Sequence, residues 1–299
     1  MQIALIGYGE VGRILAEDLH PVGHLVTACD LKLASDAGKP LREHASRHGI
    51  ALAAAHARAV GNAELVVSAV TANQTVSVAQ ACAPGLPQGA WFLDFNSASP
   101  GAKIRAASIV NAAGGRYVEG AVMTTLPPYR IKVPLLLGGP DAKALHPILL
   151  ALGFAPKVAS EELGVASATK MCRSVMIKGL EAMVIESLTT ARHYGVEDAV
   201  VASLYETFPG IDWEKQAAYF FQRAIEHGRR RSEEVREVAQ TVREAGLDPN
   251  SAAGTAERQA WMADLADAGV FGARGTPQFA RSADWRIESD RILQHLQKN

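Results

Sequence analysis

A chain of 299 residues is too long for one ordinary hydrophobic core and predicts two domains. The formal net charge of −1 excludes a general attraction to nucleic acid or to an anionic membrane, so we expect neither as a partner. The three cysteines are scattered without any Cys/His pattern, which predicts no metal site and favours a reducing compartment. No uncharged apolar stretch could span a bilayer and the first residues read as a strand rather than a leader, so we expect a cytoplasmic protein.

In the first half of the chain, short apolar runs alternate with helical patterns, which is the signature of a mostly parallel α/β sheet. Continuous apolar runs are typical of strands that are covered on both faces. The predicted strands are Ile3–Ile6, Leu25–Cys29, Leu65–Ser68, Trp91–Asp94, Arg116–Gly120, Lys132–Leu137 and Ala155–Val158, with helices at Arg13–Leu19 and Ala142–Leu152.

The second half begins with a proline-free segment, Glu161–Tyr194, that is rich in alanine, leucine, methionine and isoleucine. This composition predicts one helix about 50 Å long at about 1.5 Å per residue, with Ser160 as its N-cap and Gly195 just past its end. The rest reads as helices broken at 209–210, 246–249 and 269–277. We therefore predict an α/β domain at 1–159 and an all-α domain at 160–299 begun by the long helix.

The segment after the first predicted strand reads Gly-Tyr-Gly-Glu-Val-Gly and opens a helix. In this context GxGxxG indicates a Rossmann domain: the first glycine permits a tight turn, the second lets the pyrophosphate approach, and the third lets the helix pack on the strand. The helix N-terminus then favours the anionic pyrophosphate. The cofactor-binding residues expected here are Gly7, Tyr8, Gly9, Glu10, Val11 and Gly12.

Asp30 follows the second predicted strand, where a carboxylate would bind both ribose hydroxyls and repel a 2′-phosphate. This favours NAD as the cofactor. NADP stays open because Lys32 could bind a phosphate instead, and Asp30 could also be a simple turn cap.

Polar residues follow two further predicted strands, at the edge of the sheet where ligands bind in open α/β folds. Val70, Thr71 and Asn73 are expected to contact the ribose or the nicotinamide. Asn96 and Ser97 are expected to face the same crevice, with Asn96 toward the cofactor and Ser97 toward the substrate. An ordinary turn and N-cap would explain that cluster equally well.

Lys170 stands in the middle of the long, largely apolar helix. A buried lysine is rare without a partner or a task, and desolvation lowers its pKa toward the range that a general acid/base needs. It could instead pair with Glu181 or Glu186. Arg173, one turn on, could bind a substrate carboxylate, whereas Lys178 is expected to form an ordinary surface ion pair.

A basic run, 229–231, is followed at once by two glutamates. This pattern indicates a solvated helix face rather than a nucleic-acid patch.

With these residues laid out, the chain resembles the β-hydroxyacid dehydrogenase superfamily, which includes 3-hydroxyisobutyrate dehydrogenase, tartronate semialdehyde reductase and 6-phosphogluconate dehydrogenase. Its second half is similar to the C-terminal domain of phosphogluconate dehydrogenase-like NAD-binding proteins. The resemblance implies that Lys170 is the acid/base lysine. The segments that carry it are Gly7–Gly12, Asp94–Pro100, Glu119–Thr124 and Ala168–Ser174.

This sequence departs from the family pattern at three places. The family's Ser-Gly-Gly substrate loop is replaced at 122–125, so Met123 and Thr124 are the expected substrate contacts. The asparagine one turn after the lysine is Ser174, which is also expected to touch the substrate. Phosphogluconate dehydrogenases carry a glutamate where this chain has Ile177, which argues against that reaction.

The sequence thus predicts an NAD(P)-dependent dehydrogenase of a small hydroxy acid, of the 3-hydroxy acid or aldonate type. An imine reductase, or oxidation followed by decarboxylation or rearrangement, stays open. The alternative is a non-catalytic NAD-responsive protein, and the presence of Lys170 argues against it. We also expect at least a homodimer, because the apolar helices exceed what one small domain can cover.

Overall fold

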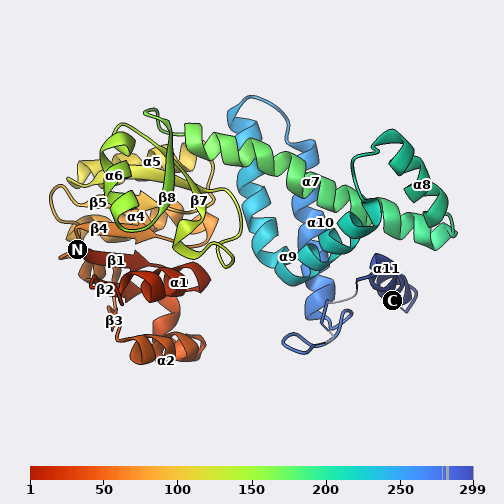
Figure 1. Ribbon diagram of the computed structural model, residues 1–299, viewed down its shortest axis with the longest axis horizontal. Helices are drawn as coiled ribbons and strands as arrows, with labels where there is room; N and C mark the ends of the chain where they lie inside the picture. The colour runs from red at the N-terminus through yellow and green to blue at the C-terminus, as the bar shows by residue number, and fades with distance from the viewer. Residues whose placement is uncertain (278, 281–282, 299) are drawn as a thin grey trace. The chain divides into compact units, whose positions relative to one another are not determined.

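The computed structural model describes residues 1–277, 279–280 and 283–298. They divide into two compact units, Met1–Cys172 and Arg173–Asn299, each considered by itself below. The first unit is α/β and the second is all-helical, which confirms the predicted fold class (Figure 1).

The described part of the first unit contains an eight-stranded sheet with the order β3-β2-β1-β4-β5-β6-β7-β8. Neighbouring strands pair in parallel except β6 and β7, which are antiparallel. The strands are β1 (Gln2–Ile6), β2 (Leu25–Cys29), β3 (Ala51–Leu52), β4 (Leu65–Ser68), β5 (Trp91–Asp94), β6 (Arg116–Val122), β7 (Pro134–Gly138) and β8 (Ala155–Ser160).

Helices cover both faces of this sheet, and alternate residues of each strand point to opposite cores. In β1, Ile3 and Leu5 pack with α1, α2 and α6, whereas Ala4 and Ile6 pack with α3, α4 and α5. The continuous apolar runs of the sequence are therefore explained by burial on both sides. The helices are α1 (Glu10–Leu19), α2 (Lys39–His48), α3 (His56–Val60), α4 (Thr75–Cys82), α5 (Pro100–Ala112) and α6 (Ala142–Ala151).

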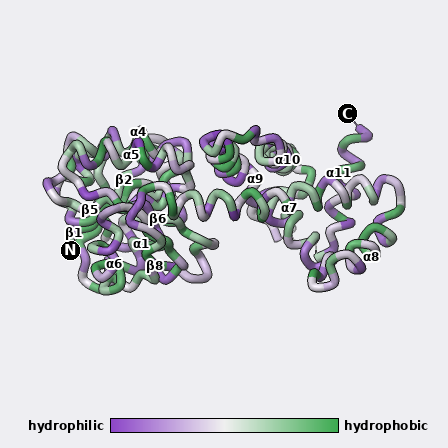
Figure 2. The backbone as a smooth tube through the Cα atoms, turned by 90° about the horizontal axis from the view of Figure 1, so that it is seen from above, coloured by the Kyte–Doolittle hydropathy of each residue, from purple (hydrophilic) through white to green (hydrophobic). Residues whose placement is uncertain are grey.

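The second unit is built on the long helix α7, most of which belongs to it, and on four further described helices. Hydrophobic and hydrophilic stretches alternate along these helices, as expected for elements that bury one side (Figure 2). Their core includes the aromatic side chains of Phe221, Phe271 and Trp285. The helices are α7 (Val165–Tyr194), α8 (Glu197–Thr207), α9 (Trp213–Glu244), α10 (Asn250–Asp267) and α11 (Trp285–Leu296).

The predicted start of the long helix is wrong. Ser160 ends β8, its hydroxyl accepts from the backbone N–H of Glu162 at 3.0 Å, and α7 begins only at Val165. The local pattern of a serine followed by two glutamates forms a turn here instead of a cap. The other end is as predicted, since Gly195 follows α7 with a φ of 67°.

Within the described residues, no helix combines the length and the apolar character needed to cross a membrane.

Candidate active site

The glycine-rich loop joins β1 to α1, and its three glycines meet different surroundings. Gly7 has a φ of 93°, and a Cβ there would lie 2.3 Å from the carbonyl oxygen of Ala69. At Gly12 a Cβ would lie 2.1 Å from the carbonyl oxygen of Gly7, so the helix packs tightly on the loop. Both positions require glycine for the protein's own packing.

Gly9 differs, because a Cβ there would meet nothing within 4 Å and its φ is an ordinary −73°. The fold itself does not demand glycine at this position. The absent side chain leaves open backbone at the N-terminus of α1, where a pyrophosphate can approach closely. The residues present therefore fit a dinucleotide.

The other loop residues contribute mainly through their backbone. Tyr8 is fully buried, and its hydroxyl lies 2.9 Å from Nδ1 of His44, so its ring anchors the loop in the hydrophobic core. Burial raises the pKa of Tyr8 to about 12. Glu10 is exposed and Val11 is half-buried.

Asp30 follows β2 and connects it to the glycine-rich loop. One carboxylate oxygen accepts from the backbone N–H of Tyr8 at 2.9 Å, and the other accepts from the backbone N–H of Lys32 at 2.9 Å. Each oxygen keeps a second lone pair for a ribose hydroxyl. Lys32 is exposed and lies two residues further on. The turn-capping and ribose-binding interpretations of Asp30 are thus compatible.

Asn96 is buried and joins the ends of two neighbouring strands. Its amide oxygen accepts from the backbone N–H of Val70 at 2.7 Å, and its amide nitrogen donates to Oγ of Ser68 at 3.1 Å. Thr71 and Asn73 are hydrogen-bonded to each other by their side chains at 2.9 Å. Asn96 therefore fixes the loop after β4 against the loop after β5.

Lys170 reaches the loop after β5: its Nζ donates to Oγ of Ser97 at 2.6 Å. Both residues belong to the first unit, since its boundary falls at Cys172. The two glutamates that the sequence offered as alternative partners each pair with an arginine, Glu181 with Arg231 and Glu186 with Arg258. A cationic amine thus lies beside a hydroxyl at the carboxyl edge of the parallel sheet.

A buried ion pair, which the sequence analysis did not predict, supports this loop. Lys103 and Asp94 are both 1% exposed, and Nζ of Lys103 lies 3.0 Å from Oδ1 of Asp94. The same carboxylate accepts from the Tyr117 hydroxyl at 2.6 Å and from the backbone N–H of Asn96 at 2.8 Å. The only sequence signal was a lysine on the largely apolar helix α5.

The remaining predicted substrate residues lie on two segments. Met123 and Thr124 directly follow β6, at the same edge of the sheet as Ser97 because β5 and β6 are parallel. Arg173 and Ser174 lie on α7 at the start of the second unit, where Arg173 is exposed and Ser174 is buried. Ser174 is one helical turn beyond Lys170.

Lys178 is not the surface residue that the sequence predicts. Its side chain is 10% exposed and pairs with Glu234 at 2.6 Å. Burial lowers the pKa of Lys178, because the neighbouring Glu234 carboxylate only partly compensates for lost hydration. The prediction of a solvated face for the basic run 229–231 is also only partly correct, because Arg231 is buried and pairs with Glu181.

The described residues bring one possible set of metal ligands together, in Glu17, His44 and His48, whose ligand atoms lie within 4.8 Å of one another. His44 already uses both ring nitrogens, with Tyr8 on one side and Glu17 on the other. Glu17 also pairs with Arg130 at 2.8 Å. We interpret this cluster as a hydrogen-bonded support of the glycine-rich loop.

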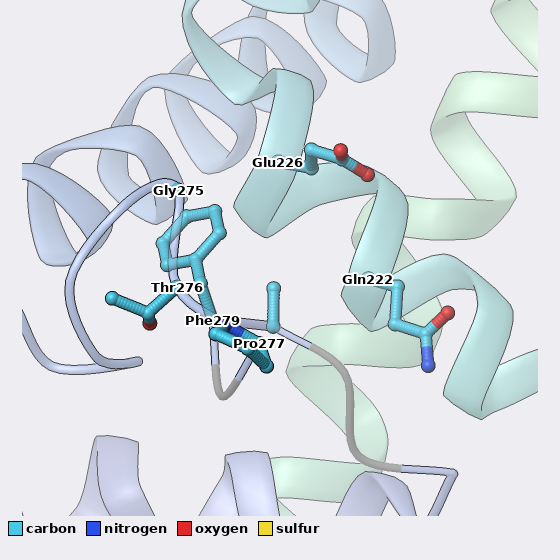
Figure 3. Close-up of a pocket in the computed structure, with 7 residues that line it drawn as sticks. Gln222, Glu226, Gly275, Thr276, Pro277 and Phe279 are labelled. Carbon is cyan, nitrogen blue, oxygen red and sulfur yellow. The ribbon is translucent and has the colours of Figure 1, made fainter.

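The second unit has a hollow of about 590 Å³ lined by Gln222, Glu226, Thr276, Pro277 and Phe279, among others (Figure 3). A carboxylate beside apolar rings repels an anionic group. We therefore do not assign this hollow to the dinucleotide or to a substrate carboxylate.

Residues 2–153 match the family model of the NAD binding domain of 6-phosphogluconate dehydrogenase, which is more than half of the chain. Residues 191–262 match a domain of unknown function (DUF1932). The chain belongs to the β-hydroxyacid dehydrogenase superfamily. Its cofactor is a nicotinamide dinucleotide, in keeping with the open backbone at Gly9.

The more similar relatives carry no assigned activity. A conserved hypothetical protein from Sinorhizobium meliloti 1021 is 36% identical, with a TM-score of 0.73 over 97% of this chain and 96% of that chain. An uncharacterized 28.5 kDa protein from Methanothermus fervidus is 26% identical over 83% of this chain and 94% of its own length.

Two enzymes share the fold at lower identity. Mycobacterium tuberculosis 3-hydroxyisobutyrate dehydrogenase, solved with L-serine, is 15% identical, with a TM-score of 0.70 over 97% of this chain and 98% of that chain. Reductive aminase from Aspergillus terreus, solved with NADPH and ethyl levulinate, is 20% identical, with a TM-score of 0.55 over 98% of both chains.

Proposed function

We propose that this protein is an NAD-dependent dehydrogenase of a small hydroxy acid, with Lys170 as its general acid/base. The observation that carries the proposal is the hydrogen bond of 2.6 Å from Nζ of Lys170 to Oγ of Ser97. It lies at the carboxyl edge of the parallel sheet, where open α/β folds bind their ligands. The relationship to 3-hydroxyisobutyrate dehydrogenase supports the substrate class.

The bound nicotinamide supplies or accepts a hydride at its ring. In the oxidative direction, neutral Lys170 takes the proton of the substrate hydroxyl at Nζ as the carbonyl forms. In the reductive direction, the Lys170 ammonium donates that proton to the carbonyl oxygen. The Ser97 hydroxyl holds Nζ in place and can share the substrate oxygen, since it both donates and accepts. Ser174 and Arg173, further along α7, are proposed to hold the substrate carboxylate.

We propose NAD rather than NADP because of Asp30. Its carboxylate is anchored by two backbone N–H groups, from Tyr8 and Lys32, and so carries its negative charge at a fixed place beyond β2. A fixed carboxylate accepts from the ribose hydroxyls and repels a 2′-phosphate.

An imine reductase is the second candidate. The substrate loop carries Met123 and Thr124 in place of the Ser-Gly-Gly that the family uses toward a carboxylate, and a reductive aminase shares the fold. A less polar loop would suit a substrate that lacks a carboxylate.

A spectrophotometric screen distinguishes these candidates. Purified protein is supplied with NAD or NADP and a panel of 3-hydroxy acids and aldonates, and separately with NADH or NADPH and a panel of aldehydes, ketone–amine mixtures and cyclic imines. Turnover of a hydroxy acid supports the first candidate. Turnover of imines alone would replace it with the second, and cofactor binding without any turnover would leave a non-catalytic, NAD-responsive protein.

A further inference from the structure

Glu119 lies in β6 and is fully buried, yet the proposed chemistry makes no use of it. Its carboxylate has three donors. Oε1 accepts from the backbone N–H groups of Gly164 at 2.9 Å and Ala166 at 3.0 Å, and Oε2 accepts from the hydroxyl of Ser167 at 2.8 Å. A buried carboxylate is costly unless its oxygens are bonded in this way. All three donors lie in one short segment, 164–167.

The contact that Glu119 makes is with the N-terminus of α7, which begins at Val165. The first N–H groups of a helix have no partner within the helix, and the positive end of the helix dipole favours an anion. The carboxylate of Glu119 satisfies both needs from a strand 45 residues earlier in the chain. It performs the capping that Ser160 was expected to perform.

The neighbouring strand leaves space for this side chain. A Cβ at Gly138 of β7 would lie 2.2 Å from Oε1 of Glu119. A larger residue at Gly138 would displace the carboxylate from the helix. Two strands therefore combine to hold the first turn of α7 at one place.

We infer that Glu119 is a positioning residue for Lys170, and this inference rests on the proposed function. Lys170 lies five residues after the start of α7, so the anchored first turn sets where its Nζ falls. Glu119 pairs in register with Asp94 on β5, and the loop after Asp94 carries Ser97. Glu119 therefore anchors the helix that carries Lys170, and its strand neighbour Asp94 precedes the loop that carries Ser97.

The test is a double-mutant cycle in the full-length protein, with the substrate identified by the screen above. Glu119→Ala should lower kcat roughly 10²-fold, because small misplacements of a catalytic group have effects of that size. NADH affinity, measured by fluorescence titration, should stay nearly unchanged. Adding Glu119→Ala to Lys170→Ala should lower kcat no further, because Glu119 acts only through that lysine.

Two variants separate positioning from general stability. Glu119→Gln keeps Oε1 for both backbone N–H groups, so it should retain most of the activity. Leu149→Ala removes a buried side chain of α6 and should lower the unfolding temperature with little change in kcat. If Glu119→Ala does not fold, Glu119→Asp, which withdraws the carboxylate by one methylene, takes its place in the cycle with the same expectation.

The outcomes distinguish the inference from the proposed function. Full activity in Lys170→Ala would overturn the assignment of Lys170 and this inference with it. A strong loss in Lys170→Ala together with wild-type kcat in the Glu119 variant, or additive losses in the double variant, would overturn the role of Glu119 alone.

Discussion

Nζ of Lys170 and Oγ of Ser97 lie 2.6 Å apart, although the two residues are 73 positions apart in the sequence. The lysine comes from the first turns of α7 and the serine from the loop after β5. A hydrogen bond with a charged partner is worth about 1.5–3 kcal/mol. This contact therefore restrains the position of the lysine Nζ. It also places the serine hydroxyl where it can take part in a reaction at that atom.

We expect Lys170→Ala to lower turnover by roughly 10²–10⁴-fold, the usual contribution of a positioned general acid/base. Lys170→Arg should not restore it, because a guanidinium stays protonated and cannot act as a base. Steady-state kinetics with the substrate found in the screen measures both effects. Lys143→Ala is the control, because that exposed lysine pairs with exposed Glu161 on the surface of the same unit.

Ser97→Ala should reduce kcat less than the loss of the lysine does, by roughly 10–100-fold, which corresponds to losing one charge-assisted hydrogen bond. Cofactor affinity should not change. A Ser97 variant with wild-type kcat would show that the contact is not used in turnover.

We expect Asp30 to set the cofactor preference. NADH should bind more tightly than NADPH in fluorescence titrations, and Asp30→Asn should narrow the difference because the uncharged amide repels a 2′-phosphate less. Lys32→Ala should leave NADH binding unchanged. Tighter binding of NADPH by the wild-type protein would contradict the assignment and would place Lys32 at the phosphate.

The sequence predicted the elements whose signals are local. The buried strands appear as apolar runs, and Gly7 to Gly12 mark the turn into α1. The strand β3 was missed because two residues are too few to show a strand pattern, and Ala51 and Leu52 are exposed within an alanine-rich apolar run. The start of α7 was misplaced because its cap, Glu119, comes from a distant strand. The burial of Lys178 was missed for the same reason, since its partner Glu234 lies on another helix.

The ion pair between Lys103 and Asp94 should be important for stability. Both side chains are almost fully buried, so Lys103→Met would leave the Asp94 carboxylate without its cation. We expect a loss of about 3–5 kcal/mol in the free energy of unfolding, measured with urea. The exposed pair between Arg229 and Asp264 serves as a control, and Arg229→Met should cost less than about 1 kcal/mol.

We expect a homodimer that uses the exposed apolar side chains of α7. Met176 is 71% exposed and Met183 is 61% exposed, and they lie two helical turns apart on one face. Sedimentation at micromolar concentration should give twice the mass of one chain. Met183→Glu should shift the protein toward monomer, whereas a wild-type monomer would contradict the prediction.

Tyr8 should make the stability of the protein sensitive to alkaline pH. Burial raises its pKa from 10.0 to about 12. Between these two values the unfolded chain loses the phenol proton while the folded protein keeps it, so the folded state binds more protons and its stability falls as pH rises.

Tyr8→Phe lacks this titration, and it also leaves Nδ1 of His44 without its partner at 2.9 Å. The variant should therefore be less stable than the wild type at pH 8, by about 1–3 kcal/mol, with a smaller difference at pH 11. Urea unfolding at both pH values measures this, with Tyr129→Phe, at a half-exposed tyrosine, as the control. An equal difference at both pH values would show that Tyr8 ionises as readily in the folded protein as in the unfolded chain.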